Sequence, residues 1–153
     1  LMGVAKEPNL YKCAVGYVGV YDLPTMYTDG DIPQRASGVR YLERVIGRNS
    51  AVLAERSPAQ QADRIRVPVF LVAGREDVRT PPKQTEIMNR ALIAAGNTPE
   101  EFYIQSGEGH GFYDEANRLT LYTKMFEFFQ RHIGGSVEVR QATPAETGTG
   151  IGN

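Results

Sequence analysis

The 153-residue sequence is poor in several features on which particular protein functions depend. It holds one cysteine, Cys13, so no disulfide can form within the chain. Lysine and arginine (17) nearly balance aspartate and glutamate (18), giving a formal net charge of −1. This balance offers no basic field to attract nucleic acid or an anionic membrane. Histidine occurs only twice, at His110 and His132, which makes the surroundings of each one informative.

Long apolar segments are absent as well. The longest, 67–74 (VPVFLVAG), is far shorter than the roughly 20 residues that a membrane span needs. We therefore expect a soluble protein of the cytoplasm or periplasm that binds neither membrane nor nucleic acid, and we expect no metal and no cofactor. Hydrophobic residues still make up 41% of the chain and charged residues 23%, which suits one domain with a sizeable core.

Segments of strand character alternate with segments of helical character. We expect strands at 11–20, 67–74 and 101–106, longer helices at 82–95 and 118–133, and shorter helical pieces at 1–6, 38–46 and from Ser57, an N-cap candidate, onward. This alternation predicts an α/β fold, a mostly parallel sheet flanked by helices, with the first two strands buried on both faces. The small and polar residues of 134–153 predict a flexible tail after a single domain of residues 1–133.

Two loops that follow predicted strands carry residues suited to acid–base chemistry. Asp77 comes just after segment 67–74, and His110 lies in GEGHGF just after 101–106. Functional groups of open parallel sheets sit beyond the carboxyl ends of the strands, so the two side chains are expected within about 2.6–3.2 Å. A carboxylate there would fix the imidazole tautomer and leave the other ring nitrogen as a general base. By composition alone, Glu76 is as good a candidate for this carboxylate as Asp77. The alternative is that Asp77 is an ordinary turn or cap residue without a catalytic role.

These same residues resemble a known family. SPAQQADRIRVPVFLVAGREDVRTPPKQTE followed by GEGHGF is similar to the C-terminal half of the α/β-hydrolase domain of the prolyl oligopeptidase family of serine peptidases. The most specific matches are the G-x-x-D ending at Asp77, Pro81 and Gln84 after it, and the E-G-H-G-F around His110. The resemblance covers 1–133 and implies peptide hydrolysis by a Ser–Asp–His triad with Asp77 as acid and His110 as base. Ala73 departs from it, because many members have histidine there.

The nucleophile is the larger departure. Family members carry it in a G-x-S-x-G elbow, and no serine of this chain stands in that context. The opening LMGVAKEP resembles the helix after the elbow, so we expect a fragment that lacks the serine and the family's β-propeller. Such a chain is expected to be inactive alone and to self-associate through surface that the missing strands would cover.

The resemblance also implies substrate-binding residues. Arg79 is expected to reach the backbone of a peptide substrate, since a guanidinium offers a fixed fork of donors; a solvated loop arginine is the alternative. Tyr21 and Met26 fall where relatives line the pocket beside the serine, although ordinary packing also explains them. For His132 the simplest prediction is a partner for a helix C-terminus, and for Cys13 a small apolar filler.

Two other functions stay open at this stage. A smaller α/β hydrolase acting on esters or lactones shares the aspartate loop and an H-G-F, and a non-catalytic interaction piece needs no triad at all. The Ser–Pro block at Ser57 and the position of Gln84 favour the peptidase.

Overall fold

Three parallel strands in the order β1-β2-β3 form the sheet of the computed structural model, which describes residues 1–134. They are β1 (Ala14–Tyr17), β2 (Val69–Gly74) and β3 (Glu101–Gln105). In the register, Ala14 lies opposite Val69 and Phe70 lies opposite Glu101. The parallel pairing confirms the predicted α/β class. The predicted tail lies, from residue 135 on, outside the described residues.

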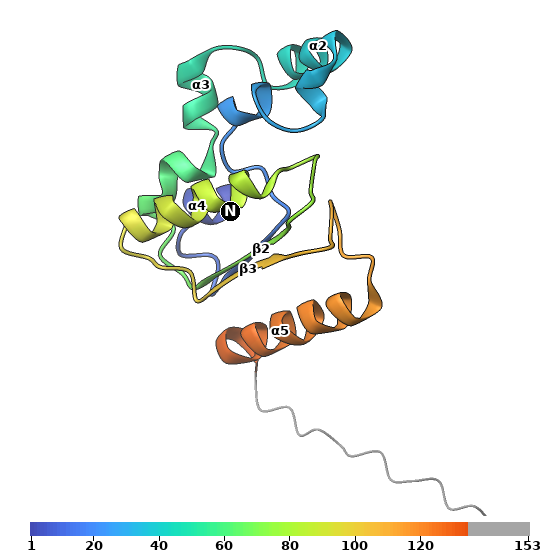
Figure 1. Ribbon diagram of the computed structural model, residues 1–153. Helices are drawn as coiled ribbons and strands as arrows, with labels where there is room; N and C mark the ends of the chain where they lie inside the picture. Colours follow the sequence, from blue (N-terminus) through green and yellow to red (C-terminus); the bar gives the residue numbers. More distant parts are fainter. Residues whose placement is uncertain (135–153) are drawn as a thin grey trace, which may run out of the picture.

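Helices cover both faces of the sheet. In Figure 1, α4 (Pro82–Ala94) lies on one side of β2 and β3, and α5 (Glu115–Ile133) lies on the other. Successive side chains of a strand point to opposite faces, so Val69 and Leu71 of β2 pack in the cluster with α4, whereas Phe70 and Val72 pack in the cluster with α5. The fully buried β2 is thus the centre of two cores. No helix of residues 1–134 has the length and apolarity to cross a membrane.

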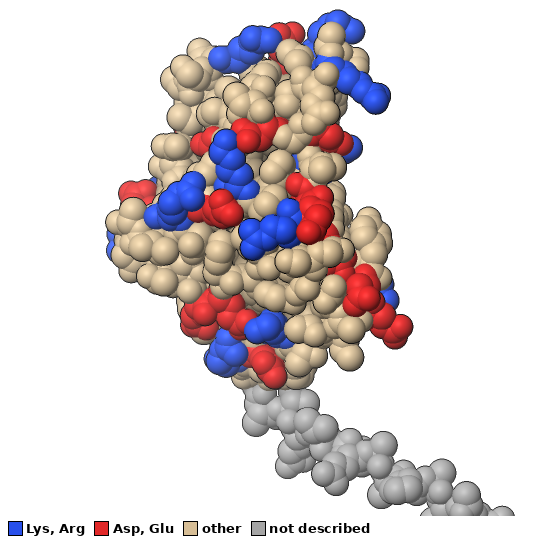
Figure 2. Space-filling view, viewed as in Figure 1, with Lys and Arg blue, Asp and Glu red and all other residues tan. Residues whose placement is uncertain are grey.

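Short helices fill the long connection between β1 and β2. They are η1 (Pro24–Tyr27), η2 (Ile32–Gln34), α2 (Ala36–Val45), α3 (Ser50–Glu55) and η3 (Pro58–Arg64), while α1 (Met2–Lys6) precedes β1. Figure 1 shows α2 and α3 gathered at one end of the molecule, beyond the sheet. Figure 2 shows basic side chains around α2 and interspersed charges of both signs elsewhere on this face.

The prediction for segment 11–20 is wrong in its length and in its burial. The segment 11–20 forms a strand only over β1, and Gly16 alone of its four residues is buried, because β1 pairs with a neighbour on one side only within the described residues. Cys13 precedes β1 and is only half-buried, but it packs against the cluster of Phe70 and Phe128, as expected of a small apolar filler. Ser57 stands at the N-cap position of η3, as predicted, but its side chain makes no capping hydrogen bond. Its hydroxyl instead accepts from the Leu23 N–H (2.9 Å) and donates to the Leu53 carbonyl (2.7 Å).

Candidate active site

Asp77 lies in the turn that follows β2, and the residue as a whole is 2% exposed. Its Oδ1 accepts hydrogen bonds from the backbone N–H groups of Arg79 and Thr80, both at 2.9 Å. A buried carboxylate needs such donors, because burying an unpaired charge is costly. The turn therefore fixes both the position and the orientation of Asp77, with Oδ2 directed away from its own backbone donors.

His110 completes a pair with this carboxylate. Its Nδ1 lies 2.9 Å from Asp77 Oδ2, although the two residues are 33 positions apart. The distance meets the geometry predicted from the strand ends. The His110 side chain is 47% exposed while that of Asp77 is 0% exposed, so the pair has a buried acid and an accessible ring. With Nδ1 facing Asp77, Nε2 is the nitrogen left for proton transfer.

Glu76, the other carboxylate predicted as a candidate partner of His110, makes different contacts. Its side chain is exposed and accepts the Gly107 N–H at 2.8 Å, and its own N–H donates to the Glu108 carbonyl at 2.9 Å. Glu76 thus ties the loop after β2 to the loop that carries His110. The structure brings His110 to Asp77 rather than to its neighbour.

The glycines around His110 allow two backbones to approach closely. A Cβ at Gly74 would lie 2.2 Å from the Gly109 carbonyl oxygen and 2.3 Å from that of Glu108. Gly111 has φ +139°, which favours glycine over other residues. The histidine loop can therefore fold back directly over the end of β2, which places His110 at Asp77.

Glu108 anchors that loop from beneath. Its carboxylate is buried and accepts from the N–H groups of Tyr113 (2.7 Å) and Asp114 (3.1 Å) and from Asn117 Nδ2 (2.9 Å). The Tyr113 N–H is the main cause that holds the pKa of Glu108 below its ordinary value, against the opposing effect of desolvation. Since these donors lie at the start of α5, Glu108 connects the His110 loop to that helix.

Thr80 lies beside the pair and is 5% exposed. Its Oγ1 is 2.9 Å from Asp77 Oδ2, 3.1 Å from His110 Nδ1 and 2.9 Å from the Val18 carbonyl oxygen. Val18 has φ +44°, an uncommon conformation for a β-branched residue. The Thr80 hydroxyl thus contacts the Asp77 carboxylate, the His110 ring and the chain just after β1.

Arg79 lies in the loop after β2 that carries Asp77, here called the acid loop, and its side chain pairs with Asp31 rather than with His110. Its Nε and Nη2 donate to the two carboxylate oxygens of Asp31, each at 2.8 Å, and this pairing lowers the pKa of Asp31. The Asp31 N–H also donates to the Val78 carbonyl at 2.8 Å. Arg79 and Asp31 lie at a cleft of about 480 Å³ between the acid loop and α2, whose further lining residues are Ile32, Gln34, Arg35, Ser37, Gly38 and Tyr41.

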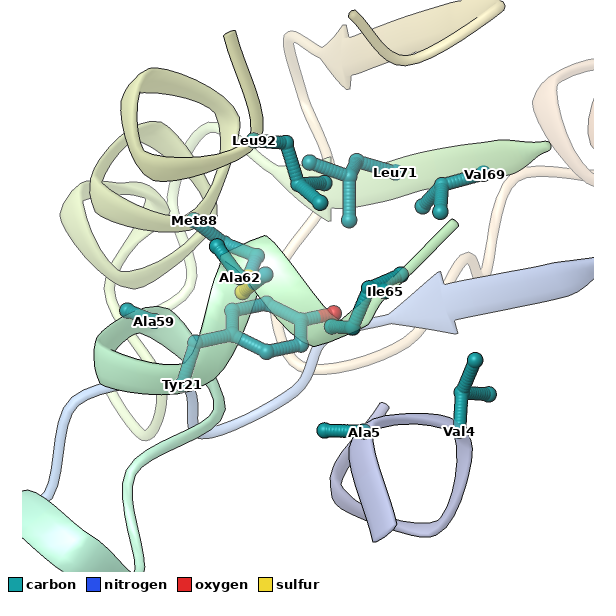
Figure 3. Close-up of a cluster of buried hydrophobic side chains, with 10 residues drawn as sticks. All are labelled: Val4, Ala5, Tyr21, Ala59, Ala62, Ile65, Val69, Leu71, Met88 and Leu92. Carbon is teal, nitrogen blue, oxygen red and sulfur yellow. The ribbon is translucent and has the colours of Figure 1, made fainter. Parts of the chain in front are cut away.

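The two predicted pocket residues lie deeper than a substrate contact requires. Tyr21 is 3% exposed, and its ring packs among Met88, Ala62 and Ile65 in the cluster beneath α4 (Figure 3). Met26 in η1 is also buried. These placements favour packing for both side chains, and the substrate contacts stay predictions.

Gln84 explains how the Tyr21 segment is held. The fully buried side chain accepts from the N–H groups of Tyr21 (2.9 Å) and Asp22 (2.8 Å) and donates to the Asp22 carbonyl (2.9 Å).

The other histidine, His132, lies in the last turn of α5, as predicted for a partner of a helix C-terminus. Its ring nitrogen is 3.1 Å from Glu100 and does not take part in the pair of Asp77 and His110.

A sequence profile of the prolyl oligopeptidase family matches residues 1–136. This chain belongs to that family. Dipeptidyl aminopeptidase BIII of Pseudoxanthomonas mexicana is 29% identical to it over 143 residues, which cover 90% of this chain and 20% of that protein. Esterase LipC of Mycobacterium tuberculosis is 32% identical over 103 residues, 64% of this chain and 25% of that protein.

A solved structure shows the same fold. The uncomplexed acylaminoacyl peptidase of Pyrococcus horikoshii superposes with a TM-score of 0.72 at 25% identity, over 88% of this chain and 22% of that one. The predicted family and the predicted fold, the C-terminal part of an α/β-hydrolase domain, are thereby confirmed. The chain spans between a fifth and a quarter of the length of the relatives it matches.

Three residues of the site were not predicted as functional. Glu108 stood inside the E-G-H-G-F that marked the prolyl oligopeptidase family, so a signal for it existed. Thr80 and Asp31 carried none, because a threonine and an aspartate in loops are common turn residues. Their role depends on contacts 30 and 48 positions away in the chain.

Proposed function

We propose that this chain supplies the acid and the base of a serine-hydrolase active site that cleaves peptide bonds. Asp77 is the acid, His110 is the base, and the nucleophilic serine belongs to sequence outside these 153 residues. The observation that carries the proposal is the 2.9 Å contact between Asp77 Oδ2 and His110 Nδ1 in a chain of the prolyl oligopeptidase family.

The chemistry follows from the two ends of the imidazole. Nδ1–H donates to the Asp77 carboxylate, which orients the ring and stabilises its protonated form. Nε2 takes the proton from the serine hydroxyl as the serine oxygen attacks the scissile carbonyl carbon, and it then gives that proton to the departing amine. The N–H groups of Arg79 and Thr80 hold the Asp77 carboxylate in place throughout.

Arg79 is the proposed substrate-binding residue. Asp31 engages Nε and Nη2, which leaves the Nη1 donors free of that pairing and able to bind a peptide carbonyl or carboxylate in the adjoining cleft. Peptide substrate is favoured by the relatives named for aminopeptidase and acylaminoacyl peptidase activity. Tyr21 and Met26 are buried, and their predicted contacts with substrate remain part of the proposal.

Ester hydrolysis is the second candidate, and one observation favours it. Esterase LipC shares 32% identity with 64% of the chain, although it covers a shorter stretch than the peptidase match. The same acid–base pair serves both reactions, because both pass through attack of an activated serine on an acyl carbon.

Substrate preference separates the two candidates. The protein encoded together with the sequence upstream of Leu1 is given aminoacyl-nitroanilides and short-chain nitrophenyl esters, and kcat/KM is compared for each class. If the protein is a peptidase, kcat/KM should differ strongly among nitroanilides with different amino acids. The activity should also require His110. Indifference to the amino-acid part, with efficient ester turnover, would favour the esterase instead.

The 153-residue chain alone provides a complementary test. Because a base without its nucleophile cannot form the acyl-enzyme, we expect no turnover that depends on His110. Turnover that vanishes in His110→Ala would place a nucleophile inside this chain and contradict the proposal.

A further inference from the structure

The hydroxyl of Thr80 contacts both members of the acid–base pair. Its Oγ1 lies 2.9 Å from Asp77 Oδ2 and 3.1 Å from His110 Nδ1. Thr80 is also the residue whose backbone N–H donates to Asp77 Oδ1. Thr80 therefore contacts both oxygens of the buried carboxylate and the ring nitrogen that faces it.

The contacts of the Thr80 hydroxyl bear on which nitrogen of His110 carries the proton. The Val18 carbonyl and the Asp77 carboxylate can only accept, and the hydroxyl brings a single proton to share between them. If His110 Nδ1 were also unprotonated, three acceptors would surround that one proton. With a proton on Nδ1, the ring donates to Asp77 Oδ2 and the hydroxyl oxygen serves as a neighbouring acceptor. The hydroxyl thus favours the Nδ1–H tautomer, in which Nε2 carries the lone pair.

The chain after β1 is bent to meet this hydroxyl. Val18 donates its N–H to the Val72 carbonyl of β2 (2.9 Å), adopts φ +44° and turns its own carbonyl toward Thr80. A β-branched residue in the left-handed region is strained, and such strain persists only where the surrounding structure imposes it. The contact links the end of β1 to the acid loop, so Thr80 is held from a third direction.

We propose that Thr80 is a positioning residue of the acid–base pair: its hydroxyl, anchored by the Val18 carbonyl, locks His110 in the Nδ1–H tautomer against Asp77. The assignment rests on the proposed roles of Asp77 and His110, and it adds a third side chain through which they are aligned. Thr80 acts through His110 and makes no contact of its own with the reacting atoms.

The Nδ1 proton of His110 gives a direct readout in the chain as it stands. Low-temperature proton and nitrogen NMR would follow the exchange of this proton with water in the wild type and in Thr80→Val, which keeps the shape and removes the hydroxyl. Losing a hydrogen bond to a charged group lowers the cost of opening the pair, so we expect exchange at least about tenfold faster in Thr80→Val. Thr80→Ser keeps the hydroxyl and should exchange at nearly the wild-type rate.

His132, the other histidine, is the internal reference, because it contacts Glu100 rather than the pair. Its ring signals should be the same in every variant. If Thr80→Val does not fold, Thr80→Ala replaces it in the comparison with Thr80→Ser. Equal exchange in the variants with and without the hydroxyl, or a wild type in which neutral His110 carries its proton on Nε2, would overturn the proposal. Because no hydrolysis is measured, the result is independent of whether the protein is a peptidase.

Discussion

Arg79 is a residue whose proposed role can be separated from folding, because its side chain is 53% exposed and belongs to neither core cluster. In the upstream-extended protein we expect Arg79→Ala to lower kcat/KM for peptide substrates by one to two powers of ten, through loss of a charge-assisted hydrogen bond to substrate. Lys83→Ala is the matched control, since Lys83 is equally exposed and pairs with Asp29 on the same loop as Asp31. If kcat/KM is the same in both variants, Arg79 does not bind substrate and is an ordinary solvated arginine of the loop.

Glu108 makes a separate prediction about acid stability. Its folded-state pKa lies below the ordinary 4.5, so the carboxylate stabilises the fold above about pH 4.5 and this contribution is lost as the pH falls through the folded-state pKa. We expect the unfolding free energy of the wild type to fall more steeply than that of Glu108→Gln between neutral pH and about pH 3. Urea unfolding at a series of pH values measures both.

The exposed Glu115, in the first turn of α5, supplies the control for this experiment. Glu115→Gln removes one carboxylate near the same end of the helix, so it shows how much of the change comes from losing a negative charge alone. If Glu108→Gln changes the pH dependence no more than Glu115→Gln does, the buried carboxylate is not the source of the acid sensitivity.

Single residues differed in how far the sequence could predict them. Asp77 and His110 were predictable because strand ends in a parallel sheet meet at one edge, a rule that needs no atomic detail. Composition could not choose between Glu76 and Asp77, since both are carboxylates in one loop; the resemblance points to Asp77, and in the structure it is Asp77 that contacts His110. Thr80 could not be found, because its proposed role depends on a contact with the carbonyl of Val18, a residue with an unusual φ that the sequence does not reveal.

Among the elements, β2 and the His110 loop approach each other closely at Gly74. Adding a Cβ at Gly74 would drive it into the backbone carbonyl oxygens of Gly109 and Glu108, which cannot move aside as a flexible side chain can. We expect Gly74→Ala to destabilise the fold by about 1–3 kcal/mol and to separate His110 from Asp77. Thermal unfolding and the His110 ring signals report the two effects.

Gly109→Ala is the control at the same junction. Its nearest contact would be the Glu76 carbonyl oxygen at 3.9 Å, and its φ lies outside the left-handed region. It should unfold close to the wild-type temperature. Similar destabilisation by both substitutions would show that the loop, and not the close approach at Gly74, limits stability.

Long elements followed from their sequence patterns, whereas short ones did not. β2 and α4 were predicted nearly to the residue, because a continuous apolar run and a regular amphipathic repeat are strong local signals. α5 begins earlier than expected because Asp114 accepts the Asn117 N–H and caps it. The burial of β1 was overestimated, since an apolar strand sequence does not reveal which neighbours flank it.

For the whole molecule, two surfaces within the described residues are candidates for association. One is a groove of about 340 Å³ beside the free edge of β1, lined by Leu1, Gly3, Val4, Tyr11, Cys13, Ala14 and Val15. The other is the outer side of α5, which exposes Leu119, Tyr122, Phe126 and Ile133. Unpaired strand edges and large apolar patches promote association.

We expect the isolated chain to self-associate between micromolar and millimolar concentration, through the groove beside β1. Sedimentation velocity measures this, and Tyr11→Lys should shift the chain toward monomer. Leu119→Lys tests the α5 surface in the same way and is expected to have the smaller effect. A monomer throughout the concentration range would contradict the prediction.

The central claim is that His110, with Asp77, is the general base of a hydrolase. It is tested most directly by kcat for an aminoacyl-nitroanilide in the upstream-extended protein, comparing the wild type with His110→Ala and His132→Ala. Removal of a triad base costs several powers of ten, so we predict that His110→Ala lowers kcat by at least roughly 10³-fold. His132→Ala, which changes the only other histidine, should stay near wild type. Turnover in His110→Ala comparable to that in His132→Ala would contradict the account.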